Sequence, residues 1–253
     1  MKEQMKVLMK QVRHLVLERI LESGYKEKLW MKKRLDVENV ESGLTFYPAK
    51  NNQQEMLEQL QNLFQKERLE ENNLPFSVET KNRIVLEFEV EKYRIPFFIE
   101  VESYRETALY PVEETLEEMK YYRFPTEEYL AHGFYEIFDK LELLNDLFWY
   151  KEIYDILRTE TIDGRRVRDC LGKLLETKKI PSFEKRLDTI KSYENYGYMK
   201  KKWKSEKKRQ NQDFPEWKEV IALLVTFISP IFHAIIEDEI FFEDWMPQLG
   251  RYL

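Results

Sequence analysis

Apolar residues at the start of the chain recur at the spacing of one helical face. They predict an amphipathic helix over residues 3–22, and Ser23-Gly24 supplies a stop signal. The same periodicity predicts a second helix over residues 53–70. The apolar positions of the two helices are Met5, Leu8, Met9, Val12, Leu15, Val16, Ile20, Met56, Leu60, Leu63 and Phe64.

Around the second helix the pattern changes to the alternation that is typical of strands. Residues 28–31 and 44–47 predict short strands. From residue 84 to residue 101 apolar and polar side chains alternate in two runs, which predicts a hairpin turning at residues 91–94. Its inward positions are Ile84, Leu86, Phe88, Val90, Ile95, Phe97, Ile99 and Val101.

After Pro125 helical patterns replace the alternation. Thr126 is predicted to cap the first of these helices, and a continuous helix is expected over residues 134–157. The apolar stretch 220–236 is 17 residues long, which is short for a bilayer crossing. It therefore predicts two buried helices meeting at Pro230, and no association with a membrane.

The change of pattern places a domain boundary near residue 124. Residues 1–124 are then an α+β domain with a mixed sheet, and residues 125–253 are an all-helical bundle.

Cysteine, histidine and glycine usage excludes several classes of site. Cys170 is the only cysteine, so no internal disulfide forms, and without a charged-then-apolar leader we expect a cytoplasmic protein. The three histidines lie far apart, which argues against a zinc cluster, and His132 and Cys170 are interpreted as structural. The seven glycines form neither a Rossmann nor a P-loop pattern.

The charges are unevenly distributed. The formal net charge is −6, yet residues 199–209 hold seven cations and one acid, and residues 219–250 contain no Lys or Arg. A basic segment that includes aromatic residues and follows three tyrosines suits RNA, whose phosphates take the charges and whose bases stack. The alternative is an ordinary solvated lysine-rich helix. The predicted contacts with RNA, for example tRNA, are Lys200, Lys201, Lys202, Trp203 and Lys204, with Arg165, Arg166 and Arg168 extending the same face.

A second candidate site lies in the predicted helix over residues 134–157. Lys140-Leu141 is followed by Lys151-Glu152-Ile153-Tyr154-Asp155, and on a helix Asp155 lies one turn past Lys151. This arrangement resembles AbiEii-type nucleotidyltransferases, the toxins of abortive-infection toxin–antitoxin systems, which carry Lys-Leu and then Arg-Asp-Ile-Tyr-Asp at the same offset. The resemblance implies a nucleotidyltransferase-like sheet, catalytic roles for Lys140, Lys151, Glu152 and Asp155, and nucleotide binding by Lys140 and Tyr154. The alternatives are an ordinary surface ion network for Lys140 and Asp155, and a core aromatic for Tyr154.

The resemblance also implies three carboxylates on the sheet, which hold Mg²⁺ against a nucleoside triphosphate. The acid pair of the family maps onto Gly43 and Thr45, neither of which is acidic. The glycine turn that should precede the pair, near residues 30–34, reads Trp-Met-Lys-Lys-Arg. Candidate metal ligands are therefore Asp36 and Glu38 in a shifted register, together with Glu100 or Glu102 as the third acid.

Two functions follow from these observations. The first is a nucleotidyltransferase-like toxin of a toxin–antitoxin or phage-defence system, which transfers a nucleotide to tRNA or protein and has a cognate antitoxin as partner. The second is a catalytically inactive binding module of the same fold that engages RNA or a protein. A nuclease is a third alternative. The aromatic C-terminal segment with Phe241, Phe242, Trp245 and Met246 is interpreted as core, or alternatively as a surface for a partner protein.

Overall fold

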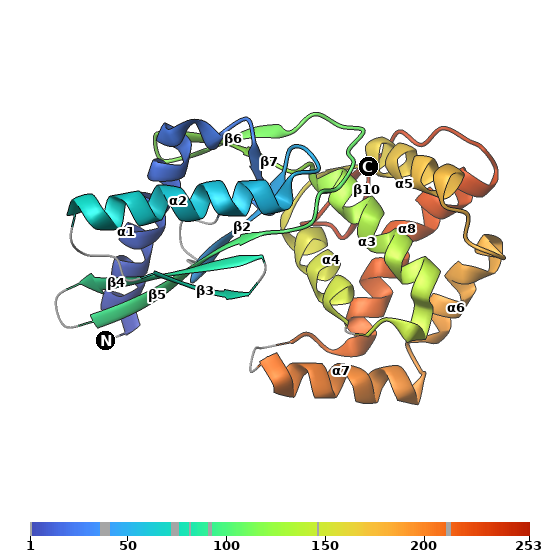
Figure 1. Ribbon diagram of the computed structural model, residues 1–253. Helices are drawn as coiled ribbons and strands as arrows, with labels where there is room; N and C mark the ends of the chain where they lie inside the picture. The colour runs from blue at the N-terminus through green and yellow to red at the C-terminus, as the bar shows by residue number, and fades with distance from the viewer. Residues whose placement is uncertain are drawn as a thin grey trace. The chain divides into compact units, whose positions relative to one another are not determined.

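The computed structural model describes residues 2–35, 41–71, 76–80, 82–90, 93–145, 147–210 and 214–253. The chain divides into two compact units, Met1–Pro125 and Thr126–Leu253. The fold class is α+β, as the patterns predict (Figure 1).

The first unit is a mixed sheet with two long helices. The sheet has seven strands in the order β3-β4-β5-β2-β1-β7-β6, and it is mixed because β2 pairs with β5, and β1 with β7, in parallel. The elements are α1 (Lys2–Ile20), β1 (Leu29–Met31), β2 (Gly43–Pro48), α2 (Gln53–Glu71), β3 (Phe76–Thr80), β4 (Arg83–Val90), β5 (Tyr93–Val101), β6 (Val112–Leu116) and β7 (Met119–Arg123), with a π-helical turn, Leu21–Tyr25, after α1.

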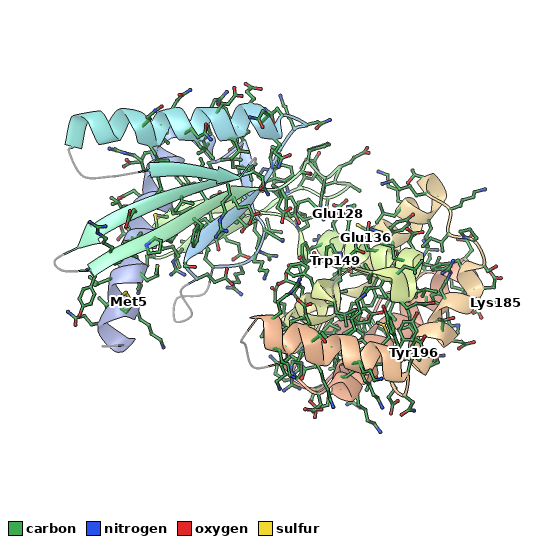
Figure 2. The ribbon with its side chains drawn as sticks, turned by 60° about the horizontal axis from the view of Figure 1, so that its bottom comes forward. Met5, Glu128, Glu136, Trp149, Lys185 and Tyr196 are labelled. Carbon is green, nitrogen blue, oxygen red and sulfur yellow. The ribbon has the colours of Figure 1, made fainter. Side chains whose placement is uncertain are left out.

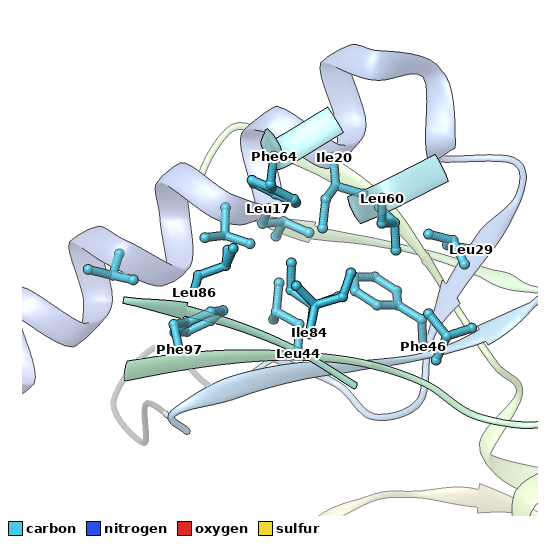
Figure 3. Close-up of a cluster of buried hydrophobic side chains, with 14 of the residues drawn as sticks. Leu17, Ile20, Leu29, Leu44, Phe46, Leu60, Phe64, Ile84, Leu86 and Phe97 are labelled. Carbon is cyan, nitrogen blue, oxygen red and sulfur yellow. The ribbon is translucent and has the colours of Figure 1, made fainter. Parts of the chain in front are cut away.

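The core of this unit lies between one face of the sheet and the two helices. Because side chains alternate across a strand, every second residue of β2, β4 and β5 points to this face. Figure 3 shows Leu44, Ile84 and Phe97 from the strands directed at Leu17 of α1 and Leu60 of α2. Period-two burial along the strands thus confirms the predicted hairpin, although Tyr93 and Arg94 belong to β5 rather than to the turn.

The β6–β7 hairpin was not anticipated by the pattern. Its turn, between Leu116 and Met119, contains no glycine, and Glu117 adopts a left-handed φ of 56° that glycine or asparagine usually supplies. Lys10 and His14 of α1 contact the Glu117 carboxylate at 3.2 and 2.9 Å. A local sequence pattern cannot predict contacts between residues so far apart in the chain.

The second unit is mainly helical but is not the all-helical bundle that was expected. Three short strands form a sheet of order β10-β9-β8, which ties the end of the chain to the start of α5. The elements are α3 (Thr126–Lys140), α4 (Phe148–Thr159), β8 (Ile162–Asp163), α5 (Gly164–Thr177), α6 (Arg186–Ser192), α7 (Gly197–Gln210), α8 (Trp217–Ile236), β9 (Asp244–Met246) and β10 (Arg251–Tyr252), with 3-10 turns at Leu141–Leu143 and Phe183–Lys185.

The prediction of a single helix over residues 134–157 is wrong. The helix ends at Lys140, Leu141 takes a left-handed φ of 49°, and Leu144 is extended before α4 begins at Phe148. Leu144 and Leu147, in the segment after the break, are buried in the core. The free energy of burying these two side chains offsets the cost of the left-handed backbone at Leu141. No glycine or proline marks the break in the sequence.

The two helices expected to meet at Pro230 are in fact one helix. Pro230 has no backbone N–H to donate to the Thr226 carbonyl, yet the helix runs unbroken from Trp217 to Ile236. The hydroxyls of Ser229 and Thr226 donate to carbonyls four residues back, at 2.6 and 2.8 Å. Judged by length and composition alone, α8 is long and apolar enough to cross a membrane. In this unit α4, α5 and α6 pack against it, and Phe134 stacks on Phe227 at 5.7 Å, as in a core helix.

Two buried tyrosines of this core differ in how their hydroxyls are satisfied. Tyr150 packs on Trp217 at 5.1 Å, and its buried hydroxyl has no hydrogen-bond partner among the described residues. Burial raises the pKa of Tyr150 well above its ordinary value. Tyr129 instead donates its hydroxyl to the buried Glu152 carboxylate at 2.8 Å.

We predict that Tyr150→Phe leaves stability unchanged or raises it, because the hydroxyl pays a desolvation cost without a compensating bond. Tyr129→Phe is the matched control and should cost about 1–3 kcal/mol, since it removes a hydrogen bond to a charged group. Urea unfolding of both variants measures the difference. A Tyr150→Phe variant destabilised as much as Tyr129→Phe would show that the Tyr150 hydroxyl has a partner.

Candidate functional site

The parallel pairing of β2 with β5 places the expected acid positions side by side. In this register Thr45 lies opposite Glu100, and Gly43 lies opposite Phe98. These four residues occupy the sheet face that points away from α1 and α2, because their neighbours Leu44, Phe46 and Ile99 fill the core on the other face. The face is therefore the one on which the resemblance places metal ligands.

Gly43 has no room for a side chain. A Cβ atom at this position would lie 2.6 Å from the Phe98 carbonyl oxygen and 2.8 Å from the Phe98 Cβ. The glycine thus permits close approach of the two strands. An aspartate at the first acid position is incompatible with this sheet.

Cations surround the acids that remain on this face. The Lys32 ammonium donates to Glu102 at 2.8 Å, and the Lys32 backbone N–H donates to the Thr45 carbonyl at 2.8 Å. Arg83 lies opposite Glu100 in the β4–β5 register, and its guanidinium covers the Phe98 ring at 3.6 Å. Two positive charges beside Glu100 and Glu102 disfavour a divalent cation.

The remaining hydrogen bonds of the acids agree with this description. Glu100 accepts from the Asn82 side-chain amide at 3.0 Å. Within the described ranges no group of three or more His, Cys, Asp or Glu side chains is arranged to hold a metal ion. Asp36 and Glu38, the shifted acid pair, lie outside the described residues.

The helical motif is divided between two helices. Asp155 lies one turn past Lys151 on α4, as expected, and the two form an ion pair; the Lys151 ammonium also lies 5.7 Å from the Phe214 ring. Lys140 is on α3 instead, where it pairs with Glu136, which Figure 2 labels. The side chains of Lys140 and Asp155 are 49% and 51% exposed. The fixed offset of one helix therefore does not relate Lys140 to Lys151.

Glu152 and Tyr154 take different positions on α4. Glu152 is buried and accepts the hydroxyl hydrogen bond of Tyr129, so it is a core acid that braces α3 against α4. Tyr154 lines a surface groove of about 450 Å³ between α4 and α8, together with Arg158 and Glu219. Of the predicted residues of the motif, Tyr154 is the one that borders this hollow.

The basic segment forms α7, and two of its predicted RNA contacts face the protein. Trp203 is buried, donates its indole N–H to the Pro215 carbonyl at 2.9 Å and packs on Trp217 at 5.3 Å. The prediction that Trp203 stacks on RNA is therefore wrong. Its burial anchors α7 on α8, and the Lys202 ammonium donates to the Leu144 carbonyl.

The opposite side of α7 faces outward. Lys200, Lys201, Lys204 and Lys208 have no acidic partner among the described residues, and Lys201, Lys204 and Lys208 are exposed. Tyr196, which Figure 2 labels, and Tyr198 are 44% and 52% exposed at the start of the helix, with ring centroids 5.9 Å apart. Sequence spacing did not separate these outward residues from Trp203 and Tyr193, which are both buried.

The arginines of α5 do not extend this surface. Arg165, Arg166 and Arg168 each pair with an acid, respectively Asp169, Asp163 and Asp238. In Figure 1 α5 lies on the far side of the second unit from α7. Cys170, on the buried side of α5, has its thiol pKa raised to about 12 by burial, as a structural cysteine would.

Comparison with protein-family models, with curated proteins and with solved structures finds no match for this chain.

We predict that Gly43→Ala destabilises the first unit by about 1–3 kcal/mol, because the new methyl group must push β2 away from Phe98. Gly172→Ala is the control: a Cβ there meets nothing within 4 Å, so alanine should stabilise α5 by up to about 1 kcal/mol. Thermal unfolding followed by circular dichroism measures both changes. An unchanged melting temperature for Gly43→Ala would contradict the close strand approach.

Proposed function

We propose that this chain is an RNA-binding module with no metal-dependent transferase activity, and that α7 is its nucleic-acid surface. The observation that carries the proposal is the row of outward lysines without acidic partners among the described residues, beside two exposed tyrosines. An RNA partner agrees with a cytoplasmic location.

The spacing of these lysines suits a phosphate backbone. Lys201, Lys204 and Lys208 stand at i, i+3 and i+7, so they share one face of α7. This face extends about 10 Å along the helix axis, at 1.5 Å per residue. Phosphates that bind there release condensed counterions, which makes the affinity dependent on salt.

The tyrosines add a contact that lysine alone does not give. Tyr196 and Tyr198 present exposed rings next to the cations, and every nucleobase has a π-face that can stack on such a ring. Unpaired bases are available in single-stranded RNA and loops but not inside a duplex. Single-stranded or loop RNA is therefore the preferred class.

The sheet of the first unit supports a binding role over catalysis. In-line nucleotide transfer needs carboxylates that hold a metal pair. Gly43 has no space for the first carboxylate, and Lys32 neutralises Glu102. The acids described on this face are occupied in internal bonds.

We predict that Lys201→Glu/Lys204→Glu/Lys208→Glu abolishes retention of single-stranded RNA in a filter-binding assay. The matched control, Lys178→Glu/Lys179→Glu/Lys185→Glu, changes the net charge equally at exposed lysines outside α7 and should bind as the wild type does. Changing the three α7 lysines to glutamine should lower the slope of log K against log salt by about 0.7 per lysine. Equal loss of RNA retention in both triple glutamate variants would show that net charge alone causes the effect, and would contradict the proposal.

A second candidate is the active nucleotidyltransferase-like toxin of a phage-defence system, with Mg²⁺, a nucleoside triphosphate and a cognate antitoxin. The parallel pairing of Thr45 with Glu100 favours it, because neighbouring strands are the source of the acids in that class. The groove beside Tyr154 offers space for a small ligand.

Incubation with each radiolabelled nucleoside triphosphate, Mg²⁺ and tRNA separates the two candidates. We expect no label on RNA or protein, since Gly43 has no space for a carboxylate and the described acids of this face are occupied in internal bonds. Transfer that is lost in Glu100→Ala and retained in Glu87→Ala would establish the second candidate instead.

A further inference from the structure

Two surfaces of opposite charge lie on opposite sides of the second unit. The basic surface consists of Tyr196, which directly precedes α7, and of Tyr198, Lys200, Lys201, Lys204 and Lys208 on α7. The acidic surface follows α8 and consists of Glu237, Asp238, Glu239, Ile240, Phe242 and Glu243. Figure 1 shows α7 along one edge of the unit, and the segment after α8 at the other edge beside α5.

The acidic surface combines charge with exposed apolar side chains. Ile240 and Phe242 are 67% and 69% exposed, although an apolar side chain is stabilised by leaving water. Two arginines of α5 contact the segment: Arg168 pairs with Asp238 at 3.2 Å, and the Arg165 guanidinium lies 5.4 Å from the Phe242 ring. An ordered segment that keeps its apolar residues outward is typical of a contact surface.

The charges point to a basic occupant. Residues 219–250 contain no Lys or Arg, and of the acids on this surface Asp238 alone has a cationic partner among the described residues, Arg168 of α5. The occupant must also offer apolar surface for Ile240 and Phe242. The basic surface has both properties, since its lysines stand beside exposed tyrosine rings.

We propose that the acidic surface of one copy of this chain binds α7 of a second copy. Within one copy the two surfaces lie on opposite sides of the unit, so the complementary charges meet between copies. The contact is head-to-tail, so a pair of bound copies still keeps one basic surface on one copy and one acidic surface on the other free. Such contacts build rings or open chains rather than a closed two-fold dimer. RNA and the second copy compete for the same lysines.

Sedimentation velocity over a concentration series tests the proposal. Two charge-reversed variants are needed, Glu237→Lys/Glu239→Lys/Glu243→Lys on the acidic surface and Lys201→Glu/Lys204→Glu/Lys208→Glu on α7. Each variant alone carries two surfaces of like charge and should sediment as a monomer. An equimolar mixture restores opposite charges at both contacts and should associate again.

The wild type should form species larger than a dimer at low salt and return to the monomer at about 1 M salt, where charges are screened beyond about 3 Å. A wild type that stays monomeric at low salt, single variants that associate like the wild type, or a mixture that stays monomeric would each overturn the proposal. The acidic-surface variant keeps the α7 lysines and should still retain RNA, at least as tightly as the wild type, because no second copy competes for them. Failure of self-association is thereby distinguished from failure of RNA binding.

Discussion

The close approach of β2 to β5 at Gly43 is the constraint on which the first unit depends. Two neighbouring parallel strands need a long connection. Between β2 and β5 this connection consists of α2, β3 and β4. The approach fixes Thr45 opposite Glu100 and closes the core beneath Leu44. Because the strands lie so close at Gly43, this position has no room for a carboxylate side chain. The close packing of the sheet therefore excludes a metal ligand at the position where the resemblance expects one.

The role of each cation depends on which partner it has. Lys32 and Lys151 lie beside carboxylates, and Lys202 donates to a backbone carbonyl. Their charges are satisfied inside the molecule and serve the fold. Lys201, Lys204 and Lys208 project from a helix that the buried Trp203 holds in place, so their charges are available to a partner. This division, rather than the net charge of the segment, is the basis for proposing α7 as a binding surface.

The regular parts of the fold could be predicted from the sequence, because strong periodicity records which face is buried. This holds for α1, α2 and the β4–β5 hairpin. The pattern failed where tertiary contacts override local preference. Examples are the break after Lys140, the unbroken helix through Pro230 and the left-handed Glu117.

For the candidate site the sequence identified the right segments but not the direction of each side chain. The Lys151–Asp155 pair could be predicted because it is local to one helix. The burial of Trp203 and Glu152 could not, because it depends on Pro215 and Tyr129, which lie elsewhere in the sequence. The crowding of Gly43 against Phe98 likewise appears only when β2 and β5 are paired.

The central proposal, that the described acids of this sheet face do not hold a divalent metal, is tested most directly by Mn²⁺ titration of the isotope-labelled protein. Bound Mn²⁺ broadens the amide signals of nearby residues in nuclear magnetic resonance spectra. We expect the amide signals of Thr45, Glu100 and Glu102 to keep their line widths as Mn²⁺ is added. Selective, saturable loss of the Thr45, Glu100 and Glu102 signals, reversed by excess Mg²⁺, would contradict the claim.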